Sequence, residues 1–220
     1  MNRWIERQEG KNMTGKKKKK KMDNMTKLLI PLAVAINMLA YNVLYSTTMV
    51  ILGDSIGTIL VGAICGPVPG AVVGVLSNLV NVIKNPVMIV MLPLNVAFGV
   101  VSGYLSKRKI FIRLWKTILC TPLYGFIGGW LSGSIIFLAM GGDFWGNMAS
   151  VFVGIPLFHA GVPKYFAMAI GQLLFDCIDK AACLVLVYLI IRSLPDRFLI
   201  KLPYGRYVTS KQYDESEIEF

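Results

Sequence analysis

Polar side chains recur at helical spacing inside an otherwise apolar stretch towards the C-terminus. Gln172, Asp176, Asp179 and Cys183 follow one another at steps of four, three and four residues, which places them on one face of an α-helix. Lys180 lies four residues after Asp176, so these two side chains can form an ion pair. Ionisable groups inside an apolar helix face protein or water and are commonly functional. Two interpretations follow: an Asp–Lys pair that holds the helix in a bundle, or contact with a substrate or partner.

A second group of polar residues interrupts the apolar segments between residues 54 and 95: Asp54, Asn78, Asn81, Lys84 and Asn95. An amide without a hydrogen-bond partner costs several kcal/mol in hydrocarbon, so each amide needs a partner or water. The group indicates either a pocket open to the outer side of a membrane, or hydrogen bonds between helices together with interface anchors.

The sequence carries few residues suited to catalysis or metal binding. Trp145 and His159 lie in a long apolar loop predicted between residues 141 and 164, where such residues anchor headgroups or cover an aromatic ligand. With one histidine and four cysteines that lack C-x-x-C spacing, we expect no metal site and no cofactor. No P-loop or H-E-x-x-H motif occurs, and we do not expect an enzyme.

The composition predicts the elements that position these residues. Hydrophobic residues make up 55% of the chain and charged residues 16%, against roughly a quarter in a soluble domain. We therefore predict an all-α, polytopic membrane protein: a compact bundle of six transmembrane helices within residues 27–195. The expected helices span about residues 27–45, 54–65, 70–83, 87–105, 117–140 and 165–192. The second and third are short for a crossing of about 30 Å and need tilt or burial against longer neighbours.

Small residues and prolines predict how these helices meet. Gly70 and Gly74, and likewise Gly125, Gly129 and Gly133, recur every four residues, a spacing that lets two backbones approach closely in lipid. The prolines of residues 66–70, Gly-Pro-Val-Pro-Gly, predict a break between the second and third helices.

The distribution of basic residues predicts the orientation. With the N-terminus inside the cell, ten Lys and Arg residues lie from the N-terminus through Lys27, five lie between residues 107 and 116, and five lie from Arg192 onward. Only Lys84 and Lys164 lie outside. We expect both termini in the cytoplasm, with residues 1–26 as a disordered basic tail and 196–220 as a C-terminal tail. The basic clusters suit a lipid bilayer, and we expect no nucleic-acid partner.

The stretch LGDSIGTILVGAICGPVPGAVVGVLSNLV, residues 52–80, places a Gly-Pro joint between an apolar helix and a Gly-Ala-rich one. This hairpin, the six predicted helices and the cytoplasmic termini resemble the substrate-binding S component of energy-coupling factor (ECF) transporters. The resemblance covers about residues 27–195. One departure lies on the first helix, where the family often has an Ala-x-x-x-Ala face for docking: here Asn37 follows Ala33 by four residues.

The resemblance implies a subunit of an ABC importer in the bacterial cytoplasmic membrane. Such a subunit captures a vitamin or related micronutrient from outside, while a transmembrane T component and two cytoplasmic ATPase subunits drive uptake. The resemblance does not identify the substrate, although Asp54, Asp176 and Asp179 could pair with a cationic or amine-bearing ligand. The alternative is a membrane-embedded sensor or interaction module without transport activity.

Overall fold

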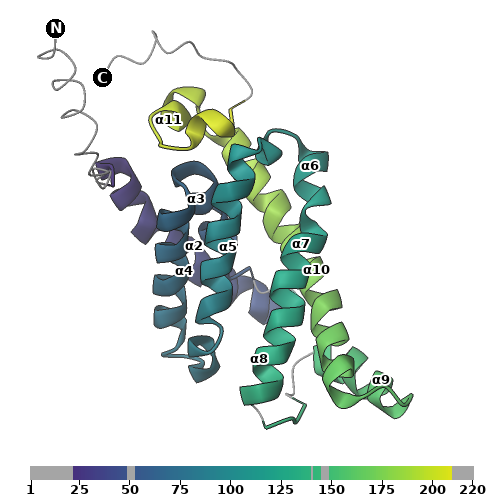
Figure 1. Cartoon of the computed structure of the whole chain (residues 1–220). Helices are drawn as coiled ribbons and strands as arrows, with labels where there is room; N and C mark the ends of the chain where they lie inside the picture. The colour runs from purple at the N-terminus through teal and green to yellow at the C-terminus, as the bar shows by residue number, and fades with distance from the viewer. Residues whose placement is uncertain (1–21, 49–52, 140, 145–148, 210–220) are drawn as a thin grey trace, which may run out of the picture.

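The computed structural model describes residues 22–48, 53–139, 141–144 and 149–209. Within these ranges 82% of the residues are helical and none lies in a β-strand, which confirms the predicted all-α class. The longer segments are α2 (Asn24–Thr48), α3 (Ile56–Cys65), α4 (Pro67–Asn81), α5 (Leu92–Lys107) and α10 (Lys164–Ser193). A composite segment runs beside α10 and consists of α6 (Leu114–Leu119), α7 (Thr121–Gly125), the π-helical turn η3 (Phe126–Trp130) and α8 (Leu131–Ala139) (Figure 1).

α3 and α4 are joined by one residue, Gly66, whose φ of 109° is a conformation that glycine adopts at little cost. The predicted break over residues 66–70 is therefore too long. Pro67 is the first residue of α4, where its missing N–H removes no helical hydrogen bond, and Pro69 lies in the same first turn. The prolines start α4 rather than separate it from α3.

Glycines bring helix backbones together at two interfaces. A Cβ atom on Gly70 would lie 2.8 Å from the carbonyl oxygen of Gly99, and one on Gly74 would lie 2.6 Å from that of Asn95. α4 and α5 are therefore in backbone contact. On the other side of the molecule a second set of glycines packs against α10 at intervals of one turn: Gly125 against Cys177, Gly129 against Leu173 and Gly133 against Ala169. Both contacts are of the close kind that the glycine spacing predicts.

The composite segment differs from the predicted helix at residues 117–140. It begins at Leu114, and the α-helix changes register at Cys120 and again in η3. Pro122 lies in the first turn of α7 and lacks the N–H that would continue the ladder from α6, which accounts for the first change.

Segments assigned to loops or tails also fold. The predicted loop contains η4 (Ser150–Gly154) and α9 (Ile155–His159). After α10, the chain forms α11 (Asp196–Ile200) and η5 (Gly205–Tyr207). The Tyr204 N–H donates to the Ile64 carbonyl at 3.0 Å, and Leu199, Leu202 and Val208 are buried. Residues 196–209 thus cover one end of α3. The remaining short elements are η1 (Pro86–Ile89) and η2 (Ile110–Ile112).

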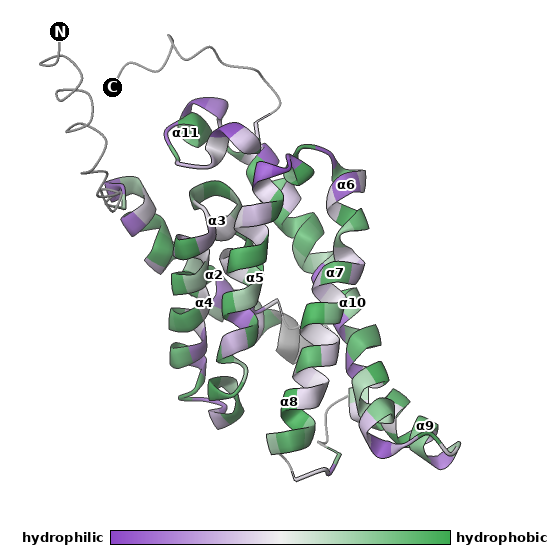
Figure 2. Ribbon diagram, in the orientation of Figure 1, coloured by the Kyte–Doolittle hydropathy of each residue, from purple (hydrophilic) through white to green (hydrophobic). Residues whose placement is uncertain are grey.

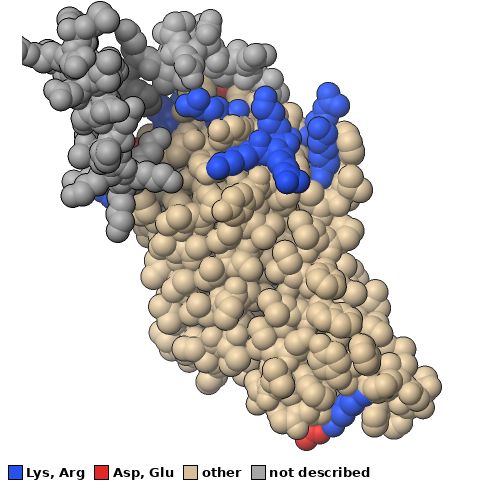
Figure 3. Space-filling model, viewed as in Figure 1, with Lys and Arg blue, Asp and Glu red and all other residues tan. Residues whose placement is uncertain are grey.

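The exterior is apolar over most of its length. Figure 2 shows hydrophobic residues along the outer helices, and Figure 3 shows Lys and Arg gathered at the end where α6 and α11 lie, with a belt lacking charged side chains below them. Within the described ranges, two segments are long and apolar enough to cross a membrane: Asn24–Val43 and Leu114–Ala139. These two point towards a membrane but do not establish six crossings, which stay a prediction.

Candidate functional site

The centre of α10 carries a buried lysine surrounded by carboxylates. Lys180 lies sixteen residues after the start of α10 and thirteen before its end, about 24 Å and 20 Å along the helix axis. Its side chain is 3% exposed. The ammonium contacts the carboxylate of Asp179, lies 3.7 Å from Oδ1 of Asp54, and sits 4.9 Å from the ring centroid of Phe98. A cation placed over an aromatic ring gains further electrostatic attraction.

The ion pair that the sequence allows between Asp176 and Lys180 is not the one that forms. Lys180 pairs instead with its neighbour Asp179 and, across the bundle, with Asp54 at the turn before α3. The backbone N–H of Gly53 explains this choice, since it donates to Asp179 Oδ1 at 3.0 Å and binds α10 to that turn. The cluster therefore joins two elements distant in sequence.

Asp176 holds a different position beside the cluster. Its Oδ2 accepts a hydrogen bond from the Ser132 hydroxyl of α8 at 3.4 Å, and Gly128 of η3 faces the same carboxylate. Among the described residues no Lys or Arg lies within ion-pair distance of Asp176. Two carboxylates, those of Asp54 and Asp179, therefore pair with the ammonium group of Lys180, and the carboxylate of Asp176 lies beside them on α10.

The asparagines of α4 and α5 form a buried chain next to these charges. The Asn95 amide donates to Oδ1 of Asn78, and the Asn78 amide donates to the Met88 carbonyl at 3.0 Å. Asn95 is 2% exposed, and its side chain lies close to the Asp54 carboxylate. The amides therefore extend the polar cluster from α3 across α5 to α4.

Several buried polar atoms in this region have no hydrogen-bond partner among the described residues: Oδ1 of Asp54, Nδ2 of Asn81, Oδ1 of Asn95 and Nε2 of Gln172. A buried polar atom left unpaired costs about 1–3 kcal/mol, so such atoms are rare unless water, an ion or a ligand meets them. Near the charge cluster, both of these atoms are acceptors: Oδ1 of Asn95, and Oδ1 of Asp54, which also forms the 3.7 Å ion pair with Lys180. The cluster therefore has spare capacity for a hydrogen-bond donor or a cation.

The other predicted site residues lie elsewhere. Lys84 is exposed and donates to Oδ1 of Asn42 at 2.6 Å. His159 is exposed in α9 beside Phe158. Gln172 lies on α10 two turns before Lys180, against η3. Trp145 lies outside the described residues. The structure thus gathers Asp54, Asn78, Asn95, Asp176 and Asp179, and leaves Lys84 and His159 apart.

Sequence reasoning missed the residues that complete the cluster. Ser132 and Phe98 supply a hydroxyl to Asp176 and a ring to Lys180, and no pattern around either residue marks it as special.

Asn37, which interrupts the Ala-x-x-x-Ala pattern, joins three helices. Its amide donates to the hydroxyls of Thr58 and Ser77 at 2.9 and 2.8 Å, and its Oδ1 accepts from the Gly57 N–H at 2.6 Å.

Comparison with protein families, with curated proteins and with solved structures finds no match to this chain. In the described part of the chain, no group of three or more His, Cys, Asp or Glu side chains is arranged to hold a metal ion. The chemistry available to the cluster is therefore that of carboxylates, amides and one ammonium group. Such a set can bind a charged or hydrogen-bonding organic group.

Proposed function

We propose that this chain is the substrate-capture subunit of an ECF-type importer, which binds a vitamin or related micronutrient for uptake driven by separate ATPase subunits. One observation carries the proposal: carboxylates gather around a buried ammonium midway along α10, inside a helical protein with an apolar exterior. Buried ionisable groups of this kind commonly mark substrate sites in membrane proteins. The hairpin that resembles the S components, residues 52–80, supplies Asp54 to the same cluster.

The proposed topology has six crossings. α2, α3, α4, α5, the composite α6–α8 segment and α10 would each run between the two membrane faces, with the basic end in the cytoplasm. α3 has ten residues, about 15 Å of helix, and all ten are buried. A helix surrounded by protein need not match the bilayer thickness, because its neighbours rather than lipid contact it. This topology leaves exposed Lys107, Arg108 and Lys109 on the inside, as the positive-inside rule requires.

The charges of the cluster favour a cationic or amine-bearing substrate. Asp54, Asp176 and Asp179 together carry three potential negative charges against one positive charge on Lys180. A buried excess of negative charge is costly unless protons or a cation offset it. An ammonium group of the substrate could meet Asp176, which has no Lys or Arg partner among the described residues, and Oδ1 of Asp54, which accepts no hydrogen bond there.

Neutralising Asp176 tests the proposal directly. In an Asp176→Asn variant we expect ligand retained by the purified chain, measured by native mass spectrometry, to fall at least tenfold, because a charge-assisted contact is lost. Uptake by cells that express the chain with its T component and ATPases should fall in parallel. Lys84→Gln, which alters a polar position outside the cluster, should leave both unchanged.

Co-purification separates this function from its alternative. A substrate-capture subunit should bring down a transmembrane T component and two ATPase subunits. A chain that retains no small molecule and brings down a signalling protein instead would be the sensor or interaction module, and the transport proposal would be wrong.

A further inference from the structure

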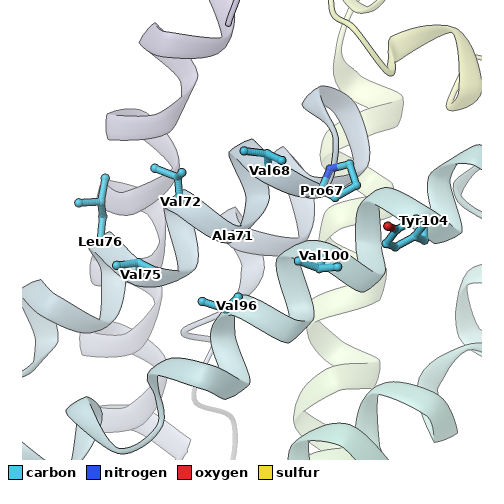
Figure 4. A pocket seen from close by; sticks show the side chains of 9 residues that line it. All are labelled: Pro67, Val68, Ala71, Val72, Val75, Leu76, Val96, Val100 and Tyr104. Atoms are coloured by element: carbon cyan, nitrogen blue, oxygen red, sulfur yellow. The ribbon is translucent and has the colours of Figure 1, made fainter. Parts of the chain in front are cut away.

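An apolar groove of about 460 Å³ lies on the outside of the bundle, between α4 and α5 (Figure 4). It is separate from the buried charge cluster. Its walls come from α4 and α5, and the residues that matter most are Pro67, Ala71, Val75, Val96, Val100 and Tyr104. Val96, Val100 and Tyr104 lie at steps of four on α5, so the groove follows the helix for about 12 Å.

The shape of the groove suits a thin, flexible chain better than another helix. The glycines of α4 and α5 face each other, as Gly70 and Gly99 do, and are therefore not available on the groove surface. Helices that dock in lipid approach through small residues, but the groove offers mainly valine and a single alanine, Ala71. Branched apolar side chains without hydrogen-bonding groups match a lipid acyl chain.

A positive charge marks one end of the groove. Tyr104 ends the groove at the basic end of the molecule, and the Lys107 ammonium lies 6.0 Å from its ring centroid and 5.5 Å from that of Tyr204. Among the described residues Lys107 makes no ion pair with an Asp or Glu side chain. Arg108 and Lys109 follow it and are exposed. Tyrosine and lysine in this order are typical of the level at which lipid headgroups lie.

We propose that the groove between α4 and α5 binds one anionic phospholipid, with an acyl chain along the groove and the phosphate at Lys107. Complementary charge selects the anionic headgroup, and the apolar walls hold the chain. The site depends on the protein lying in a membrane but not on transport, so it can be tested even if the chain carries no substrate.

Native mass spectrometry of the full chain in detergent measures this binding. The protein would be titrated with phosphatidylglycerol and, separately, with phosphatidylcholine of the same acyl chains. We expect phosphatidylglycerol to bind more tightly, with one copy bound first. Lys107→Gln should reduce this preference about fivefold, which corresponds to roughly 1 kcal/mol for one basic residue near the headgroups. Val100→Trp, which fills the groove, should abolish the tight site for both lipids.

Two control variants separate the groove from general effects. Lys116→Gln removes a charge at the same end of the molecule but away from the groove, and Leu119→Trp enlarges an exposed apolar residue of α6. Neither should change binding. Equal binding of the two lipids, or a tight site that survives Val100→Trp, would overturn the proposal. If Val100→Trp instead abolishes binding of a partner membrane protein while lipid binding persists, the groove is a helix-docking surface.

Discussion

Replacing Lys180 by methionine tests whether the charge cluster holds the bundle together. The substitution keeps an unbranched side chain of similar length over the Phe98 ring and removes only the ammonium group. The carboxylates of Asp54 and Asp179 then lose the cation that they share. Because Lys180 and Asp179 are 2% and 1% exposed, water cannot take the place of the missing charge.

The expected cost is about 3–5 kcal/mol, the usual penalty for removing one partner of a buried ion pair. For a domain of this size, 1 kcal/mol shifts the unfolding midpoint by about 2–4 °C, so the midpoint should fall by roughly 6–20 °C. Thermal unfolding of the purified chain in detergent, followed by circular dichroism, measures the shift. Lys164→Met removes a lysine from an exposed pair on the same helix and should have a far smaller effect.

The double variant Asp179→Asn/Lys180→Met separates charge from packing. It returns the charge balance of the cluster to that of the parent, and asparagine keeps an oxygen for the Gly53 N–H. We therefore expect the double variant to be more stable than Lys180→Met alone. If the single variant unfolds at the parent temperature, the buried ion pair does not stabilise the bundle. The same conclusion follows if the losses of stability caused by the two substitutions simply add in the double variant.

Three further predictions concern other parts of the chain. Asn37→Ala should lower the free energy of unfolding by about 2–4 kcal/mol, because it strands buried hydrogen-bonding groups on two neighbouring helices, and chemical denaturation in detergent measures this. Gly74→Ala should cost about 1–3 kcal/mol in the same assay, since its methyl group would lie 2.6 Å from the Asn95 carbonyl oxygen, whereas Ala35→Ser on an exposed face should cost little. The hydrogen bond and charge of Lys164 lower the pKa of Asp143, so this pair should stabilise the protein above the ordinary pKa of aspartate and weaken as the pH falls through the lowered value. Carboxyl NMR measures this pKa, and in a Lys164→Gln variant the pKa of Asp143 should rise towards its usual value.

Helices were predictable because their signals are local. The apolar runs, the prolines of residues 66–70 and the Lys-Asn-Pro sequence after α4 all act within a few residues of an element's end. The predicted helix boundaries were wrong where one local signal is compatible with two structures. Proline after glycine can separate two helices or begin the second, and only the backbone path at Gly66 decides which, since its φ of 109° reverses the chain within one residue.

The members of the polar cluster were partly predictable, but their pairing was not. Carboxylates and amides in apolar sequence must find partners, so Asp54, Asn78 and Asn95 could be nominated from the sequence alone. Spacing along one helix suggested Asp176 as the partner of Lys180. The actual partners are Asp179, the adjacent residue, and Asp54, which lies more than a hundred residues away. The Gly53 N–H that positions Asp179 is a backbone group that no side-chain pattern reveals.

The difference between local sequence signals and contacts made by distant residues also bears on how many times the chain crosses a membrane. Hydropathy marks Asn24–Val43 and Leu114–Ala139 as long and apolar enough to cross a membrane, because a helix that faces lipid must be apolar on its outer surface. α3 is enclosed by protein, and α10 carries Asp176, Asp179 and Lys180 near its middle, in or beside the charge cluster. In the proposed topology a helix enclosed like α3 need not meet the length and hydropathy limits that lipid imposes. On α10 the charged groups lie at the cluster while Leu174, Ile178 and Leu189 are exposed. If the proposed topology is right, cysteine introduced at Ala160 should react with an impermeant thiol reagent added outside intact cells, and cysteine at Lys109 should react only after the cells are opened. Labelling of Lys109→Cys from outside would place the basic loop on the wrong side and refute the six-crossing topology.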